Sequence, residues 1–155
     1  MALTLLAGCR DPGHPPPPTT YFDGLPVSGS LQDALRAGFT RCRSEWTEMR
    51  CRRDSVMLLG LGPFNAAVDL DGGYGGGGFD QITLWHDRDQ GALISVGTTL
   101  ERQGWRTCYT GAGRRGNQAV YTHQGATVSF SMDVSYWAKR RLRIIPASNR
   151  QDGQC

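Results

Sequence analysis

The segments Gly38-Phe39-Thr40-Arg41-Cys42 and Gly104-Trp105-Arg106-Thr107-Cys108 share one pattern, a Gly and an aromatic residue followed three positions later by a Cys. Each copy lies at the end of a predicted amphipathic helix, over residues 30–38 and 89–104, which begins with a capping Ser or Asp and stops at a Gly. Short predicted strands follow each copy. The pattern therefore predicts a tandem duplication of one unit, an α-helix followed by three β-strands (αβββ).

The strand predictions rest on apolar and polar residues that alternate between turn signals. In the first unit they cover residues 49–53, 65–70 and 81–85, and in the second unit residues 119–123, 129–134 and 141–145. A unit of about 60 residues buries little core by itself, so the two units, about 28–87 and 88–146, are expected to share one core. This predicts an α+β fold with a six-stranded antiparallel sheet and two helices on one face.

A tandem body of this kind resembles the β-lactamase inhibitory protein family in architecture. The resemblance rests on Gly38-Phe39-Thr40-Arg41-Cys42 followed by Cys51-Arg52, since each repeat of that family has a Cys after the helix bonded to a Cys in the next strand. It implies a Cys42–Cys51 disulfide and protein binding through the open face of the sheet. The second unit departs from this pattern, because Val120 or Tyr121 stands where a partner for Cys108 is expected.

The N-terminal Leu6-Ala7-Gly8-Cys9 resembles the lipobox of small bacterial lipoproteins, in which the bond before Cys is cut and the thiol is lipidated. Only eight residues precede Cys9 and none is Lys or Arg, so we expect residues 1–9 to be part of a longer signal peptide. The resemblance implies a lipid anchor on the periplasmic side of the cell envelope, and Arg10 after the Cys favours the outer membrane.

The Pro-rich residues 10–24 are predicted to form an extended tether between this anchor and the folded body at 25–146. Residues 147–155 are predicted to be a flexible tail. Lipidation of Cys9 leaves four of the five cysteines, an even number that is typical of disulfides in exported proteins. Cys42 and Cys51 are close enough in sequence for a hairpin to join them, and Cys108 with Cys155 is the remaining pair. A zinc site is the alternative, but the paired Cys or His spacing that it needs is missing.

Composition limits the function classes. The chain has 155 residues, 39% of them hydrophobic, which is too apolar for a wholly disordered protein. Its net charge of +3 is too small for a dedicated nucleic-acid binder. No apolar run is long enough for a transmembrane helix. The glycines at 72–78 lack the Gly-Lys-Ser/Thr ending of a phosphate loop, so they do not indicate a nucleotide site. We expect no cofactor and no metal.

Basic and aromatic residues define the predicted binding surface. All but one of the basic residues are Arg, which makes bidentate contacts with carboxylates and phosphates. Arginines gather on two predicted strands, with aromatic residues of the type that concentrates binding energy at interfaces. This predicted set is Arg50, Arg52, Arg53, Arg141, Arg143, Tyr74, Tyr136 and Trp137, with Arg140, Tyr109 and Trp46 nearby in the pattern. We expect it to bind a protein partner or an anionic envelope polymer; the alternative is that these arginines lie on solvated strand faces beside Glu and Asp.

Two other functions compete with binding. His86 beside Asp87 has the residue types of a general acid–base pair, so a small hydrolase-like enzyme that uses His86 with Asp87 or Asp133 is one alternative. Against it, Asp87 or Asp89 can simply cap the next helix. A structural envelope stability factor is the other alternative. Asp69 and Asp133 occupy the same place in each unit, either as a paired carboxylate site or as one structural hydrogen bond made twice. We favour the non-enzymatic reading.

Overall fold

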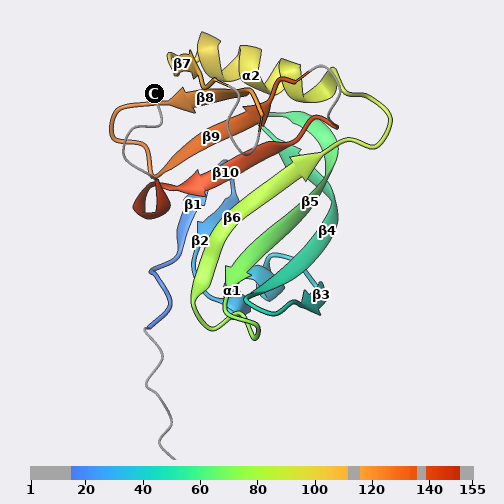
Figure 1. The fold of residues 1–155 in the computed structure, drawn as a ribbon, viewed down its shortest axis with the longest axis vertical. Coiled ribbons are helices and arrows are strands. Elements are labelled where there is room, and N and C mark those ends of the chain that lie inside the picture. Colours follow the sequence, from blue (N-terminus) through green and yellow to red (C-terminus); the bar gives the residue numbers. More distant parts are fainter. Residues whose placement is uncertain (1–14, 112–115, 136–138, 151–155) are drawn as a thin grey trace, which may run out of the picture.

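The computed structural model describes residues 15–111, 116–135 and 139–150. In this part of the chain, an eight-stranded sheet, a two-stranded hairpin and two α-helices form an α+β fold that is largely β (Figure 1). The helices are α1 (Leu31–Arg36) and α2 (Ala92–Arg102), and a short 3-10 helix, η1 (Ala147–Asn149), follows the last strand. Neither α-helix of the described residues has the length and apolar character needed to cross a membrane.

The large sheet is antiparallel throughout, in the order β3-β4-β5-β6-β10-β9-β8-β7. One half contains β3 (Arg41–Ser44), β4 (Glu48–Leu58), β5 (Leu61–Asp71) and β6 (Gly78–Trp85). The other half contains β7 (Arg106–Tyr109), β8 (Gln118–Thr122), β9 (Val128–Asp133) and β10 (Leu142–Pro146). The halves meet where β6 pairs with β10, with Leu84 opposite Leu142.

The core forms on the side of the sheet to which alternate apolar residues point. On β5, for example, Phe64, Ala66, Val68 and Leu70 are all buried. Helix α2 contributes buried residues three and four positions apart, as an amphipathic helix should: Leu93, Val96 and Leu100. Its Gly97 permits the close approach to β8, because a Cβ atom there would lie 2.3 Å from the hydroxyl oxygen of Tyr121.

The predicted six-stranded sheet is wrong in its strand count. The segments that contain Cys42 and Cys108 form strands of their own, β3 and β7, at the two edges of the sheet. Each has four residues. Every residue of β3 is exposed and no residue of β7 is fully buried, so neither strand shows the apolar alternation that marks a half-buried strand.

The helix boundaries were partly predictable. Ser30 caps α1 as expected, in a capping box with Asp33. Helix α2 begins later than the predicted residue 89, with Gly91 as its N-cap. The carboxylate of Asp89 instead accepts a hydrogen bond from the Gly91 N–H at 2.8 Å, in the turn that leads into the helix.

The ordered body begins before residue 25. Strands β1 (Thr20–Phe22) and β2 (Leu25–Ser28) form a hairpin that packs against β6 and β10. Phe22 meets the rings of Trp105 and Phe130 edge-on, at centroid distances of 5.8 and 5.1 Å. The fold thus includes the last residues of the segment predicted as a tether.

The ordered body also ends after residue 146. The Asn149 side-chain amide donates hydrogen bonds to the backbone carbonyls of Phe79 and Asp80, at 3.1 and 3.0 Å. The first residues of the predicted tail are therefore fastened to β6.

A disulfide joins Cys42 of β3 to Cys51 of β4, which confirms the predicted bond. The two residues are directly opposite each other in the strand pairing. Cys108 of β7 is disulfide-bonded too. Cys9 and Cys155 lie outside the described residues, so lipidation of Cys9 and the pairing of Cys108 with Cys155 remain predictions.

Candidate functional site

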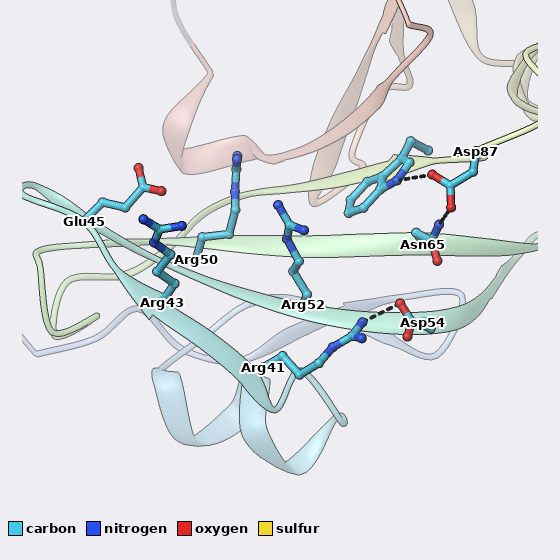
Figure 2. A pocket seen from close by; sticks show the side chains of 9 residues that line it. Arg41, Arg43, Glu45, Arg50, Arg52, Asp54, Asn65 and Asp87 are labelled. Atoms are coloured by element: carbon cyan, nitrogen blue, oxygen red, sulfur yellow. Dashed lines mark hydrogen bonds and ion pairs between the residues drawn. The ribbon is translucent and has the colours of Figure 1, made fainter.

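Four arginines converge on one face of β3 and β4 because of strand alternation and register. On β4, Arg50 and Arg52 flank the fully buried Cys51, so they point away from the core. Strand pairing places Arg43 opposite Arg50 and Arg41 opposite Arg52. All four side chains line a groove of about 670 Å³, here called the arginine groove (Figure 2).

The rest of the groove wall comes from Glu45 in the turn after β3, from Asp54 on β4, and from β5, β6 and the turn after β6. The Trp85 indole N–H donates to one carboxylate oxygen of Asp87 at 3.1 Å. The Asn65 amide donates to the other oxygen at 2.8 Å (Figure 2). The Arg52 guanidinium lies over the indole, with its carbon 5.8 Å from the ring centroid, as in a cation–π contact. Trp85 is therefore held in one orientation at the wall of the groove.

The four guanidinium groups differ in how their charge is balanced. Arg50 forms a two-point ion pair with Asp69, at 2.6 Å from Nε and 2.9 Å from Nη2. This hydrogen-bonded partner raises the pKa of Arg50. Arg41 pairs with Asp54, but both side chains are more than half exposed, so this ion pair contributes little. Within the described residues, no carboxylate forms an ion pair with Arg43 or Arg52.

A smaller hollow of about 160 Å³ continues the groove toward β10. Four residues border both spaces: Arg50, Arg52, Trp85 and Asp87. Ala67, Thr83, His86 and three consecutive basic residues complete the smaller one. These basic residues are Lys139, Arg140 and Arg141. Arg140 is held by hydrogen bonds to backbone carbonyls, from Nη1 to Gln90 at 3.0 Å and from Nε to Asp133 at 3.3 Å. Arg141 is exposed at the start of β10.

Asp69 and Asp133 anchor two separate hydrogen-bond networks. Asp69 accepts from Arg50 and, at 3.0 Å, from Gln81. Asp133 accepts from Arg143 at 3.0 and 3.3 Å and from Gln118 at 2.6 Å. Both carboxylates are buried, and each has its charge balanced by its own Arg. Each carboxylate thus forms its own buried ion pair, and the two carboxylates do not share one site.

The structure divides the predicted binding residues. It brings Arg50, Arg52, Arg140 and Arg141 together around the two hollows. Arg143 is bonded to Asp133 and its side chain is only 12% exposed. Arg53 points to the other side of β4, where it donates to the Ala37 carbonyl at 2.6 Å.

The predicted aromatic residues do not line these hollows in the described structure. Tyr74 is highly exposed on the loop between β5 and β6, outside both hollows. Tyr136 and Trp137 lie outside the described residues. Sequence reasoning missed Arg41, Arg43 and Trp85, although alternation around Cys42, together with the predicted Cys42–Cys51 bond, already aligned Arg41 and Arg43 with the arginines of β4.

His86 is occupied within its own turn. Its Nδ1 accepts hydrogen bonds from the backbone N–H groups of Asp89 and Arg88, at 2.8 and 3.3 Å. The carboxylate of Asp87 binds Trp85 and Asn65. In the described part of the chain, no three His, Cys, Asp or Glu residues form a cluster that could hold a metal ion.

No known protein family, curated protein or solved structure matches this chain. The proposed function therefore rests on the fold and on the arginine groove.

Proposed function

We propose that this protein is a non-enzymatic envelope lipoprotein that binds an anionic partner, either an acidic protein or an anionic envelope polymer, through the arginine groove. The observation that carries the proposal is the pair Arg43 and Arg52, whose guanidinium groups have no carboxylate partner among the described residues and line a groove with two other arginines. Guanidinium groups crowded in this way repel one another, and a ligand with acid groups relieves the repulsion while it forms bidentate hydrogen bonds.

The proposal includes a duplicated body. The element order α1-β3-β4-β5-β6 recurs as α2-β7-β8-β9-β10, and the sheet order is symmetric about the β6–β10 pair. Asp69 and Asp133, on the equivalent strands β5 and β9, support the same reading. Each unit then has four strands where we predicted three. Contacts of α1 with Arg53 of β4 and of α2 with Tyr121 of β8 support two helices on the core face of the sheet.

The cellular location rests on the cysteines and the N-terminal sequence. Cys42, Cys51 and Cys108 are oxidised, which is typical of exported proteins and rare in the cytosol. Together with the lipobox-like Leu6-Ala7-Gly8-Cys9, this supports a lipid anchor on the periplasmic side of the envelope, with the outer membrane favoured.

Binding of a soluble polyanion to the full chain tests the groove. Poly-L-glutamate and oligogalacturonate are titrated against the wild type, Arg43→Gln, Arg52→Gln and the control Arg102→Gln, which alters an Arg in the last turn of α2. We expect each groove variant to weaken binding about tenfold, the size of one charge-assisted hydrogen bond, and the control to change it little. Binding of neither polyanion at low salt, or an equal loss in Arg102→Gln, overturns the proposal.

A further inference from the structure

We propose that the ligand of the arginine groove is an anionic polysaccharide, one of whose sugar rings packs on Trp85 while its acid groups bind the guanidinium groups on either side. This inference rests on the proposed function and selects one of its two ligand classes. An acidic protein is the competing class.

The lining of the two hollows is unlike the centre of a protein–protein interface. Among the described lining residues, only Ala67 and Trp85 are apolar, and Ala67 is buried. The buried centre of a protein interface is depleted in charged residues and is about 65% apolar. The large exposed aromatic side chains of the described residues all lie outside both hollows: Tyr21, Trp46, Tyr74 and Tyr109.

A single fixed indole among polar groups suits a sugar ring. The C–H bonds on one face of a pyranose are apolar and weakly positive, so they pack on the negative face of an aromatic ring. The ring's hydroxyl groups then reach hydrogen-bonding side chains at its edge, and Asn65, Thr83 and Asp87 lie around Trp85. Because Asp87 holds the indole N–H, Trp85 loses little further freedom when a ring packs on it.

The positions of the cations fit a polymer that crosses the strands. Arg43 lies on β3, Arg52 on β4, Trp85 on β6 and Arg141 at the start of β10. Strands are about 4.8 Å apart, so from β3 to β10 these groups span about 19 Å across the sheet. A single small anion would contact one end of this row. A chain of acidic sugars places acid groups at both ends and a ring on the indole between them.

Matched polyanions separate a sugar ligand from an acidic peptide. The full chain is titrated with oligogalacturonate, with poly-L-glutamate of the same number of charges, and with neutral dextran. We expect oligogalacturonate to bind about fivefold more tightly than poly-L-glutamate, a gain typical of one aromatic packing contact. Trp85→Leu should remove this preference, so that the two polyanions bind with equal affinity, whereas the control Trp46→Leu, at a fully exposed indole, should preserve it.

A measurement on the wild type covers the case in which Trp85→Leu fails to fold. The indole N–H signals in an NMR spectrum report on each Trp separately, and the Trp85 signal should shift with oligogalacturonate while that of Trp46 stays in place. Equal affinity for both polyanions with an unmoved Trp85 signal overturns the inference and leaves the proposed function standing. Tighter binding of poly-L-glutamate also overturns it, in favour of an acidic protein. Binding of neither polyanion removes the proposed function as well.

Discussion

Cys42 and Cys51 are bonded at directly opposed positions of β3 and β4, and this bond lies between two pairs of facing arginines. Arg43 faces Arg50 on one side of it, and Arg41 faces Arg52 on the other. Like charges directly opposite each other destabilise an antiparallel pair. The disulfide thus holds the short edge strand β3 beside β4 although the facing arginines repel one another. A preformed anion site requires that such arginines be held close together before the ligand binds.

The first prediction concerns this bond. Replacing both cysteines, in Cys42→Ala/Cys51→Ala, should lower the free energy of unfolding by roughly 2–3 kcal/mol, because the unfolded chain loses the constraint of a short closed loop. Affinity for oligogalacturonate should fall as well, since β3 no longer holds Arg41 and Arg43 beside β4. Urea unfolding and titration of the same samples measure the two effects. An unchanged affinity would show that β3 does not contribute to the site.

The second prediction separates stability from binding in the groove. Asp69→Asn removes the partner of Arg50, so the protein should lose roughly 2–3 kcal/mol of stability while polyanion affinity rises, because Arg50 is freed for the ligand. Asp133→Asn is the matched control, since it breaks the same type of side-chain network around Arg143, which lines neither hollow. It should lower stability without changing affinity. A gain of affinity in both variants would mean that total charge, and not the groove, controls binding.

The third prediction is a pH dependence at the cap of α1. Hydrogen bonds from the Ser30 backbone N–H and side chain lower the pKa of Asp33 to about 2. A carboxylate with a lowered folded-state pKa stabilises the fold above its unfolded-state pKa, near 4, and this contribution is lost as pH falls toward the folded value. Wild type should therefore exceed Asp33→Asn by about 1 kcal/mol in unfolding free energy at pH 6.

That advantage should shrink between pH 4 and pH 2, as measured by urea unfolding at several pH values. Asp54→Asn serves as the comparison, because its ion pair with Arg41 is exposed and should contribute little at any pH. An advantage of wild type over Asp33→Asn that is as large at pH 2 as at pH 6 would contradict the assignment.

The fourth prediction concerns the anchor. Protein expressed with a complete upstream leader and extracted from membranes should carry a diacylglycerol on Cys9 and lack two hydrogens for each disulfide, at Cys42–Cys51 and at Cys108. Intact mass measurement tests both points at once. An unmodified cytosolic protein with five free thiols would remove the lipoprotein proposal and would return His86 and Asp87 to consideration as a cytosolic active site.

Local signals predicted the parts of the fold that depend on neighbouring residues. The Ser30 cap defined the start of α1, and alternation within the predicted strand at 65–70 defined Ala66, Val68 and Leu70 as the buried side of β5. Strands β3 and β7 escaped prediction because they are short and polar, and only pairing with β4 and β8 makes them strands. Tertiary pairing, not local preference, determines such edge strands.

In the candidate site, too, local sequence patterns predict some features, and others depend on tertiary strand pairing. Arg50 and Arg52, which were predicted as binding residues, line the groove because alternation around the buried Cys51 points them outward. Their part in binding stays a prediction. The same alternation turns Arg53 to the opposite side of β4, toward α1, although Arg53 was predicted as a binding residue. Arg143 could not be separated from the binding residues in advance, since its partner Asp133 comes close only through the pairing of β9 with β10.

The salt dependence of polyanion binding tests the central claim most directly. The affinity of the full chain for oligogalacturonate is measured from low to high salt, for wild type and for the double variant Arg43→Gln/Arg52→Gln. Each guanidinium that contacts the ligand should steepen the slope of log affinity against log salt by about one, so the double variant should lose about two from the wild-type slope. An identical slope in both proteins would contradict binding through the arginine groove.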